Sequence, residues 1–425
     1  MEPYLGCIAD DFTGGTDLAS MLARHGLKTI QTIGVPTEPL AQDVNAIVIA
    51  LKSRTVLPEV AVHESLHALE YLRSIGCRQI YFKYCSTFDS TDQGNIGPVT
   101  DALMSVLETD FTIACPAFPD NKRTVYNGYL FVGDVLLSES GMQNHPLTPM
   151  RDSNLVRVLQ RQTSSKVGLV RSEIVSAGVE AVRNSFQTLE ASGVRVAIID
   201  ALNEHDLLAI GQACFGMPLL TAGSGAALGI ATDLIRRGVI AASTTVSSMP
   251  VIAGHQAILA GSCSYATQRQ VASALRGGVP GFVVDPLQLI SNESVVQTAV
   301  EWARPLLRQG PVLIYSTDEQ QQVKKIQGKL GVERAGKIIE ETLAAIARLL
   351  VEEGVTQLIV AGGETSGAVV KALGITQLVI GPSIAPGVPW TLGLGSQPVN
   401  LTLKSGNFGD DDFFTSSWAR LNARN

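Results

Sequence analysis

The sequence has little charge and no concentration of basic residues. Charged residues make up 17% of its 425 residues and hydrophobic residues 45%, and 32 Lys and Arg against 39 Asp and Glu give a net charge of −7. A disordered chain would be poorer in apolar residues, so this chain can bury a large core. Without a run of Lys and Arg it lacks the electrostatic footprint of a protein that binds nucleic acid or an anionic membrane. We expect neither as a partner.

The cysteines form no C-x-x-C pair, which argues against a zinc cluster and against a dense disulfide framework. They are Cys7, Cys77, Cys85, Cys115, Cys214 and Cys263. The N-terminus, MEPYLGCIADDFTGG, lacks the basic and apolar regions of a secretory signal. The weakly charged segment 217–235 contains TAGSGAALG, which favours a strand, a turn and a buried helix over a membrane span. These features predict a cytoplasmic protein.

Short apolar runs alternate with longer amphipathic stretches, a pattern typical of βαβ units in a mainly parallel sheet. In the first half, helices are expected near 16–25, 58–75 and 95–107. The expected strands there are Leu5–Ala9, Thr29–Ile33, Ala46–Ala50, Gln79–Lys83, Thr112–Cys115, Lys166–Val170, Val194–Ile199 and Pro218–Thr221. The stretch 116–150 breaks this rhythm and is predicted to be a long turn. Such loops are usually functional, although a subunit-contact arm in a homo-oligomer is the alternative.

The segment 238–250, GVIAASTTVSSMP, has no charge and no clear period, as expected of a connector. We place a domain boundary there, giving domains 1–240 and 250–425. The alternation restarts after it, with a long helix near 335–353 and a Gly- and Pro-rich tail, 382–409, that predicts turns and short antiparallel strands. The expected strands are Ala257–Ala260, Phe282–Val284, Val312–Tyr315, Gln357–Val360 and Gln377–Ile380. The predicted fold class is two α/β domains with mainly parallel sheets.

Polar residues follow three predicted strands of the first domain. The first strand is followed by DDFTGG (10–15), the third by KSRT (52–55), and the fourth runs into KYCSTFD (83–89). Open α/β sheets bind ligands at the carboxyl ends of their strands, and these cations, carboxylates and hydroxyls suit a small polyhydroxylated anion. The alternative is internal: Asp10 or Asp11 caps the following helix and Arg54 pairs with it.

Glycine-rich turns follow strands of the second domain. They are LAGSCS (259–264), VAGGETSG (360–367) and KSGNFG (404–409), and in such turns backbone N–H groups can hold phosphate. None matches the Walker pattern, which suggests a nucleotide site of another design. In the first domain, TAGSGAALG (221–229) has the spacing G-x-G-x-x-x-G, which favours close helix–strand packing over a dinucleotide site. No pattern identifies metal ligands.

Longer strings connect these turns to a family. IADDFTGGTDLAS, ALKSRT, YFKYCSTFDSTDQGNIGPVTDAL, CPAFPDNKRTVYNGYLFVGD, LAGSCSYATQRQV, AGGETSGAVV and KSGNFGDDDFF occur in order between about residues 5 and 415. They closely resemble the four-carbon acid sugar kinases. KYCSTFDST and GYLFVGD make the chain look like the 3-oxo-tetronate 4-kinases in particular. Lys122 departs from the family, where Gly is expected at this position.

The resemblance implies an ATP-dependent kinase that phosphorylates the C4 hydroxyl of a 3-oxo-tetronate. It also implies an N-terminal sugar-acid-binding domain, a C-terminal nucleotide-binding domain and an active site in the cleft between them. The implied contacts of the acid are Asp11, Arg54, Lys83, Tyr84, Cys85 and Ser86. Those of ATP are Ser262, Gly362, Gly363, Glu364, Thr365 and Gly406.

Phosphoryl transfer needs a carboxylate near the attacking hydroxyl, for which Asp11 or Asp10 is predicted, with Asp89 next. Mg²⁺ is expected with ATP, and Glu364 is the one candidate protein ligand. A kinase of threonate or erythronate remains the closest alternative. An NAD-dependent dehydrogenase should show G-x-G-x-x-G after an early strand instead of DDFTGG, and a non-catalytic sensor would not need the second glycine-rich domain.

Overall fold

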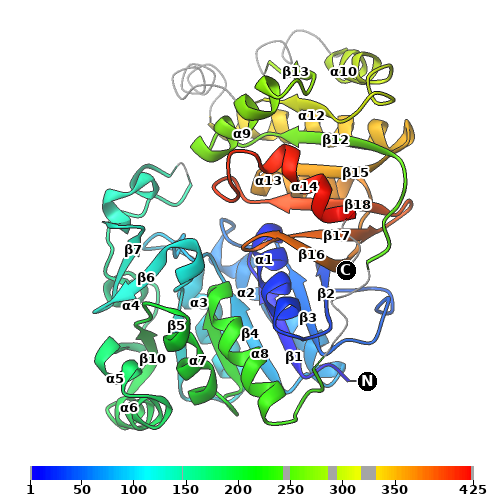
Figure 1. The fold of residues 1–425 in the computed structure, drawn as a ribbon. Coiled ribbons are helices and arrows are strands. Elements are labelled where there is room, and N and C mark those ends of the chain that lie inside the picture. Colours follow the sequence, from blue (N-terminus) through cyan, green and yellow to red (C-terminus); the bar gives the residue numbers. More distant parts are fainter. Residues whose placement is uncertain (1, 146, 243–248, 286–293, 317–331, 423–425) are drawn as a thin grey trace. The chain divides into compact units, whose positions relative to one another are not determined.

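The computed structural model describes residues 2–145, 147–242, 249–285, 294–316 and 332–422. The packing of the chain divides it into two compact units, Met1–Val246 and Ser247–Asn425, here called the N-terminal and the C-terminal domain. Each combines a sheet with covering helices (Figure 1). No helix in the described part of the chain combines the length and the apolar composition needed to cross a bilayer.

The N-terminal domain is built on a parallel sheet with the strand order β2–β3–β1–β4–β11–β5–β10–β9. Its central strands are buried along their whole length, and a parallel strand covered on both faces reads as a continuous apolar run. All strands but β11 therefore coincide with the predicted ranges, and β11 lies one residue later. The strands are β1 (Leu5–Ala9), β2 (Thr29–Ile33), β3 (Ala46–Ala50), β4 (Gln79–Lys83), β5 (Thr112–Cys115), β9 (Lys166–Val170), β10 (Val194–Ile199) and β11 (Leu219–Ala222).

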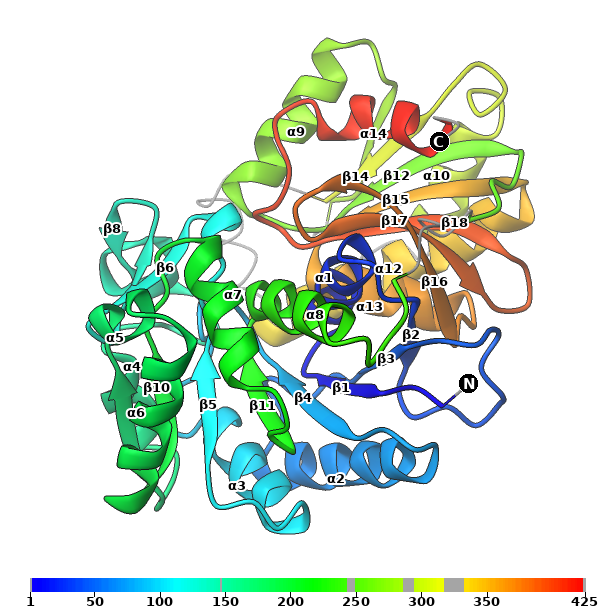
Figure 2. The ribbon, with the colours of Figure 1, turned by 60° about the horizontal axis from the view of Figure 1, so that its bottom comes forward.

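Helices cover both faces of this sheet (Figure 2). One layer contains α1 (Phe12–Arg24), α5 (Ser172–Ser176), α6 (Val179–Ala191), α7 (Glu204–Ala213) and α8 (Ala227–Arg236). The other contains α2 (Pro58–Ser74), α3 (Ile96–Val106) and α4 (Leu155–Gln160). In the first layer α7 and α8 pack through glycines, since a Cβ on Gly229 would lie 2.0 Å from the Leu207 carbonyl oxygen. The glycines of TAGSGAALG thus serve close packing.

The prediction for the start of α1 is wrong, because the helix begins at Phe12 and not near residue 16. Asp11 caps it by accepting a hydrogen bond from the Gly14 N–H at 3.0 Å. A Cβ on Gly15 would lie 2.9 Å from the Cβ of Ala50, so the glycine lets the first turn approach β3. Two glycines that suggest a loop in the sequence are here part of a helix packed against the sheet.

The expectation of a long turn over 116–150 is also wrong in part, since this stretch contains a three-stranded antiparallel sheet. Asn127 and Gly128, both at positive φ, connect its first two strands, as expected of a two-residue hairpin. Strands this short show no measurable alternation, so the Asn-Gly pair was the only local signal. The elements are η1 (Pro119–Asn121), β6 (Arg123–Tyr126), β7 (Tyr129–Val132), β8 (Val135–Leu136), η2 (Leu137–Glu139) and η3 (Gly141–Asn144).

The C-terminal domain has the strand order β13–β14–β12–β15–β18–β17–β16, parallel from β13 to β18 and antiparallel from β18 to β16. The tail does form antiparallel strands, as predicted, but β18 also pairs with β15 and so extends the parallel sheet. The strands are β12 (His255–Ala260), β13 (Gly281–Val283), β14 (Val312–Tyr315), β15 (Val355–Ala361), β16 (Gln377–Ala385), β17 (Val388–Leu394) and β18 (Val399–Lys404).

An aromatic cluster forms part of the core of this domain. Trp390 on β17 packs on Trp418 with ring centroids 5.4 Å apart, and Phe413 and Phe414 join them. Helices that contact one another form two groups. One group contains α9 (Tyr265–Arg276) and α14 (Phe413–Asn422), and the other contains α10 (Val295–Ala303), α12 (Val332–Glu352) and α13 (Gly363–Ala372). Both domains therefore belong to the predicted class, α/β with mainly parallel sheets.

Candidate active site

The polar turns of the N-terminal domain meet because their strands end in register. Ala9, the last residue of β1, pairs with Ala50 of β3 and with Lys83 of β4. The backbone N–H of Arg54 then donates to the Asp10 carbonyl oxygen at 3.2 Å. The predicted residues Asp10, Asp11, Arg54 and Lys83 are thus brought to the carboxyl edge of one sheet.

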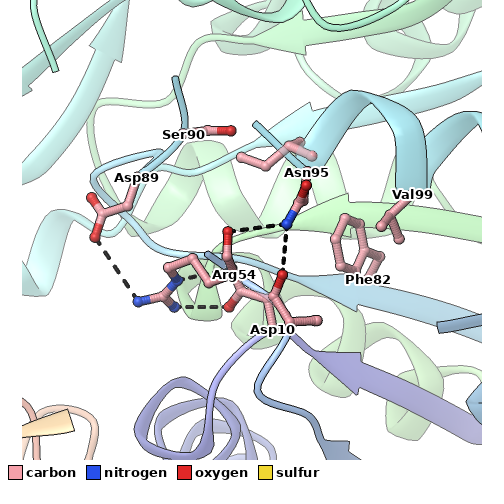
Figure 3. A pocket seen from close by; sticks show the side chains of 9 residues that line it. Asp10, Arg54, Phe82, Asp89, Ser90, Asn95 and Val99 are labelled. Carbon is pink, nitrogen blue, oxygen red and sulfur yellow. Dashed lines mark hydrogen bonds and ion pairs between the residues drawn. The ribbon is translucent and has the colours of Figure 1, made fainter. Parts of the chain in front are cut away.

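Arg54 is held between carboxylates (Figure 3). Its Nε and Nη2 donate to both oxygens of Asp10 at 2.9 and 2.8 Å, and Nη2 also donates to Asp11 at 2.5 Å. Its Nη1 lies 3.9 Å from Asp89. The internal pairing considered for Arg54 is therefore present: two of its three nitrogens donate hydrogen bonds to acids, and the third, Nη1, is ion-paired with Asp89 at longer range.

The two neighbouring aspartates differ in exposure and in pKa. Burial raises the pKa of Asp10 and outweighs the opposing charge of Arg54. Burial acts in the same direction on Asp11, but the charges of Arg54 and Lys83 and the hydrogen bonds from Thr13 and Gly14 outweigh it, so the pKa of Asp11 is lowered. The Asp11 side chain is also more exposed, at 21% against 7%. Asp11 therefore has the lower pKa and is the more accessible member of the pair.

The four predicted residues of the β4 turn have different environments. Lys83 is buried, and its Nζ donates to the Tyr84 carbonyl oxygen at 2.8 Å. The Tyr84 hydroxyl pairs with Thr221 Oγ1 at 3.1 Å inside the core, and its backbone N–H donates to the Ala222 carbonyl oxygen at 3.1 Å, so the predicted contact of Tyr84 with the acid is not supported: the residue is fully buried and bonded within the chain. Cys85 Sγ lies 2.9 Å from Thr87 Oγ1, and Ser86 is buried.

A small cavity of about 10 Å³ lies beside Arg54, and its lining includes Asp10, Arg54 and Asp89 together with Ser53, Phe82, Ser90, Asn95 and two residues of α3. That volume suits about one water molecule and no four-carbon acid. Asn95 closes the cavity, because its Nδ2 donates to the carbonyl oxygens of Ser53 at 2.7 Å and Val56 at 2.9 Å. The hydrogen bonds of Asn95 therefore support the turn that carries Arg54. The cavity itself is too small to be the acid site.

Sequence reasoning missed two residues of this edge, Asp17 and Arg123. Asp17 on α1 accepts a hydrogen bond from Ser224 through Oδ2, while its buried Oδ1 has no partner among the described residues. Burial raises the pKa of Asp17 to about 6, although the Lys83 charge and the Ser224 hydrogen bond oppose the shift. Arg123 begins β6, and its buried Nε likewise lacks a partner in the described part of the chain. No spacing rule singles out either residue.

In the C-terminal domain, three strand ends bring the predicted nucleotide residues together. Ala361 of β15 pairs with Ala260 of β12 and with Lys404 of β18, so Ser262, Gly362 and Gly406 follow neighbouring strands. A Cβ on Gly406 would lie 2.5 Å from Ser262 Oγ. A Cβ on Gly362, whose φ is +126°, would lie 3.2 Å from the Ser262 nitrogen. The two glycines thus leave space beside Ser262 that a side chain would fill.

The N-terminus of α13 opens beside these turns. Gly362 caps the helix without a side chain, and the next residues, Gly363 and Glu364, are exposed. Thr365 is buried, with Oγ1 3.0 Å from the place of a Cβ on Gly362. Free N–H groups at a helix N-terminus together with glycine turns form a phosphate-binding arrangement.

Side-chain hydrogen bonds to backbone carbonyl oxygens hold the turn that carries Gly406. The Gly406 carbonyl oxygen accepts hydrogen bonds from Lys404 Nζ at 2.9 Å, Thr267 Oγ1 at 2.9 Å and Ser264 Oγ at 2.5 Å. Lys404 Nζ also donates to the carbonyl oxygens of Ser405 at 3.0 Å and Phe408 at 3.2 Å. Burial lowers the pKa of Lys404 to about 7.

Both domains match known families. A family described as the sugar-binding N-terminal domain covers residues 5–230, and one described as the nucleotide-binding C-terminal domain covers 257–414. The fold and these two matches place the chain in a class of two-domain sugar kinases. The chain belongs to the four-carbon acid sugar kinase family, and its similarity lies with the 3-oxo-tetronate kinases of that family.

Relatives match nearly the full chain. The 3-oxo-tetronate kinase of Burkholderia multivorans is 57% identical over 420 residues, covering 99% of this chain and 98% of the relative. That of Cupriavidus necator is 53% identical over 423 residues, covering 99% and 98%. A solved structure of a Salmonella typhimurium protein, 43% identical, superposes with a TM-score of 0.86 and covers 97% of this chain and 98% of its own.

Proposed function

We infer that this protein is an ATP-dependent kinase that transfers the γ-phosphoryl group to the C4 hydroxyl of a 3-oxo-tetronate. The observation that carries the inference is the near-complete match to curated 3-oxo-tetronate kinases, in a chain with a charged edge in one domain and glycine turns in the other. We assign acid binding to residues 1–240 and nucleotide binding to residues 250–425.

In the first domain, Asp11 is proposed to orient the C4 hydroxyl and accept its proton late in the transfer, with Asp10 as the neighbouring carboxylate. The lowered pKa and the greater exposure of Asp11 support assigning this role to Asp11 instead of Asp10. Lys83 supplies positive charge, Cys85 and Ser86 line the turn, and the buried Tyr84 supports it from the core. For Arg54 we propose a contact through Nη1 and, through its bonds to both aspartates, the placement of their carboxylates.

In the second domain, Gly362, Gly363 and Gly406 are proposed to let the ATP phosphates approach the backbone, with Ser262 and Thr365 donating hydroxyl hydrogen bonds. Mg²⁺ is proposed to arrive with ATP and to neutralise phosphate charge, with Glu364 as its protein ligand. The described residues hold no cluster of three or more His, Cys, Asp or Glu suited to a metal ion, which fits an ion bound mainly through phosphates.

The reaction requires the acceptor hydroxyl and the γ-phosphate to meet in line, with water kept out. Because each substrate belongs to a different domain in this proposal, bringing the two together is part of each catalytic cycle. The six cysteines are free thiols, and we place the enzyme in the reducing cytoplasm.

The decisive experiment is to incubate the protein with ATP, Mg²⁺ and 3-oxo-tetronate and to identify the product by phosphorus NMR. A 4-phosphate, formed faster than from threonate or erythronate, is expected, with loss of turnover in Asp11→Asn. Faster turnover of the reduced acids would reassign the substrate within the family. Formation of a 2-phosphate would overturn the orientation, and reduction of NAD without ATP consumption would overturn kinase activity.

A further inference from the structure

Two arginines lie at the carboxyl edge of the N-terminal sheet, and they differ in their partners. Arg54 donates to both oxygens of Asp10 and to Asp11. A substrate carboxylate placed there would stand beside two carboxylates that already use the guanidinium. Arg123 forms no ion pair with any carboxylate of the described residues, and its Nη1 donates only to the Asn121 carbonyl oxygen. A partly buried cation without a counter-ion is costly, which points to an anionic ligand.

Buried polar atoms without partners among the described residues belong to Arg123 itself and to two residues that interact with it, Asn121 and Asp17. In the described part of the chain, its own Nε and Asn121 Nδ2 are donors without an acceptor, and Asp17 Oδ1 is an acceptor without a donor. Burial lowers the pKa of Arg123 despite the opposing effects of Cys85, Asp89 and Asp17. These residues therefore share one electrostatic neighbourhood, to which Lys83 also belongs through its effect on Asp17. A short hydroxy acid offers what is missing, since its carboxylate accepts and its hydroxyl donates.

The backbone around Arg123 is rigid, as a binding residue requires. Phe118 and Arg123 exchange two backbone hydrogen bonds, of 2.8 and 3.0 Å. The preceding segment packs on the 223–225 turn, where a Cβ on Gly225 would lie 2.3 Å from the Ala117 carbonyl oxygen. Binding residues that are held before the ligand arrives lose less conformational entropy on association.

We propose that Arg123, assisted by Asn121, binds the C1 carboxylate of the sugar acid and that Asp17 accepts a hydrogen bond from the adjacent C2 hydroxyl. The assignment rests on the proposed function and makes Arg123 the residue that selects acids over neutral sugars. It leaves the far end of the chain, with C4, for phosphorylation, and it gives Arg54 the placement of Asp10 and Asp11.

The test compares 3-oxo-tetronate with erythrulose, which has a CH₂OH group in place of the carboxylate. For Arg123→Gln we expect kcat/KM for the acid to fall by about a hundredfold, as for the loss of a charged hydrogen-bonded partner, and kcat/KM for erythrulose to change little. The KM for ATP should stay unchanged, and Arg123→Lys should recover part of the loss. Lys122→Gln, which removes the exposed cation next in sequence, is the matched control and should keep the wild-type preference.

An equal loss on both substrates, or no loss on the acid, would overturn the assignment. Arg54→Gln should lower turnover of both substrates alike, and a selective loss of the acid in this variant would return the carboxylate to Arg54. Calorimetric titration of 3-oxo-tetronate without ATP gives a readout independent of turnover, in which Arg123→Gln should weaken binding. If the wild type binds the acid but does not phosphorylate it, the proposed function fails while the Arg123 assignment can still be decided.

Discussion

Lys404 allows a quantitative test of the nucleotide domain, through Lys404→Met. Its ammonium is fully buried and donates to Thr267 Oγ1 and to carbonyl oxygens of residues 405, 406 and 408, with no carboxylate among these partners. Burial lowers its pKa to about 7, whereas an unfolded lysine has a pKa of about 10.4. Between these two values the unfolded chain binds one proton more than the folded chain. Wild-type stability should therefore rise with pH in this window.

The size of the effect follows from the two pKa values. Each pH unit of the window adds up to about 1.4 kcal/mol to the free energy of unfolding. Since Lys404 is half titrated at its folded pKa, the gain from about pH 7 to pH 9 is about 2 kcal/mol. Burial raises the pKa of the Cys263 thiol and acts in the opposite direction at high pH. That contribution is common to wild type and Lys404→Met, so the difference between the two proteins isolates Lys404.

The assay is guanidinium denaturation followed by tryptophan fluorescence. All three tryptophans, Trp302, Trp390 and Trp418, lie in the C-terminal domain, so the signal reports that domain alone. The stability of wild type minus that of Lys404→Met should increase by about 2 kcal/mol from about pH 7 to pH 9. Lys337→Met, which removes an exposed lysine of α12, should not share that slope. A flat or falling difference for Lys404→Met would refute the reasoning.

Three further predictions concern other positions. Gly406→Val places a side chain 2.5 Å from Ser262 Oγ, so calorimetry should show ATP binding weakened about tenfold or more with acid binding unchanged. Ser224→Ala removes a hydrogen bond that lowers the pKa of Asp17. The acidic limb of the pH profile of kcat/KM for the acid, expected near pH 6, should therefore move upward by about half a pH unit or more. An unmoved limb would contradict a role for ionised Asp17. Lys122 has a φ of 56°, which explains why Gly is expected there. Lys122→Gly should therefore raise the free energy of unfolding by about 0.5–1 kcal/mol, measured by thermal unfolding with circular dichroism. An unchanged or lower free energy of unfolding would mean that the left-handed turn carries no strain.

Most regular elements of this protein could be predicted from the sequence, because the burial of each element is reflected in the order of apolar and polar residues within it. Strands such as Leu5–Ala9 and Ala46–Ala50 are covered on both faces, and each reads as an apolar run. Elements that depend on a partner distant in the sequence could not be predicted in this way. The first turn of α1 needs Gly15 because β3 lies against it, and the hairpin strands 123–136 are too short for any periodic signal.

The sites divide in the same way. The sequence placed polar turns after strands, and resemblance to a family attached them to an acid and to ATP. Which charge faces which is a matter of tertiary structure, since it depends on atoms far apart in the chain. Arg54 meets Asp10 44 positions away and is neutralised there, whereas among the described residues Arg123 has no ion-pair partner and Asp17 Oδ1 has no donor. Pairing between side chains is decided by distances of a few ångströms after folding, and no pattern along the chain records those distances.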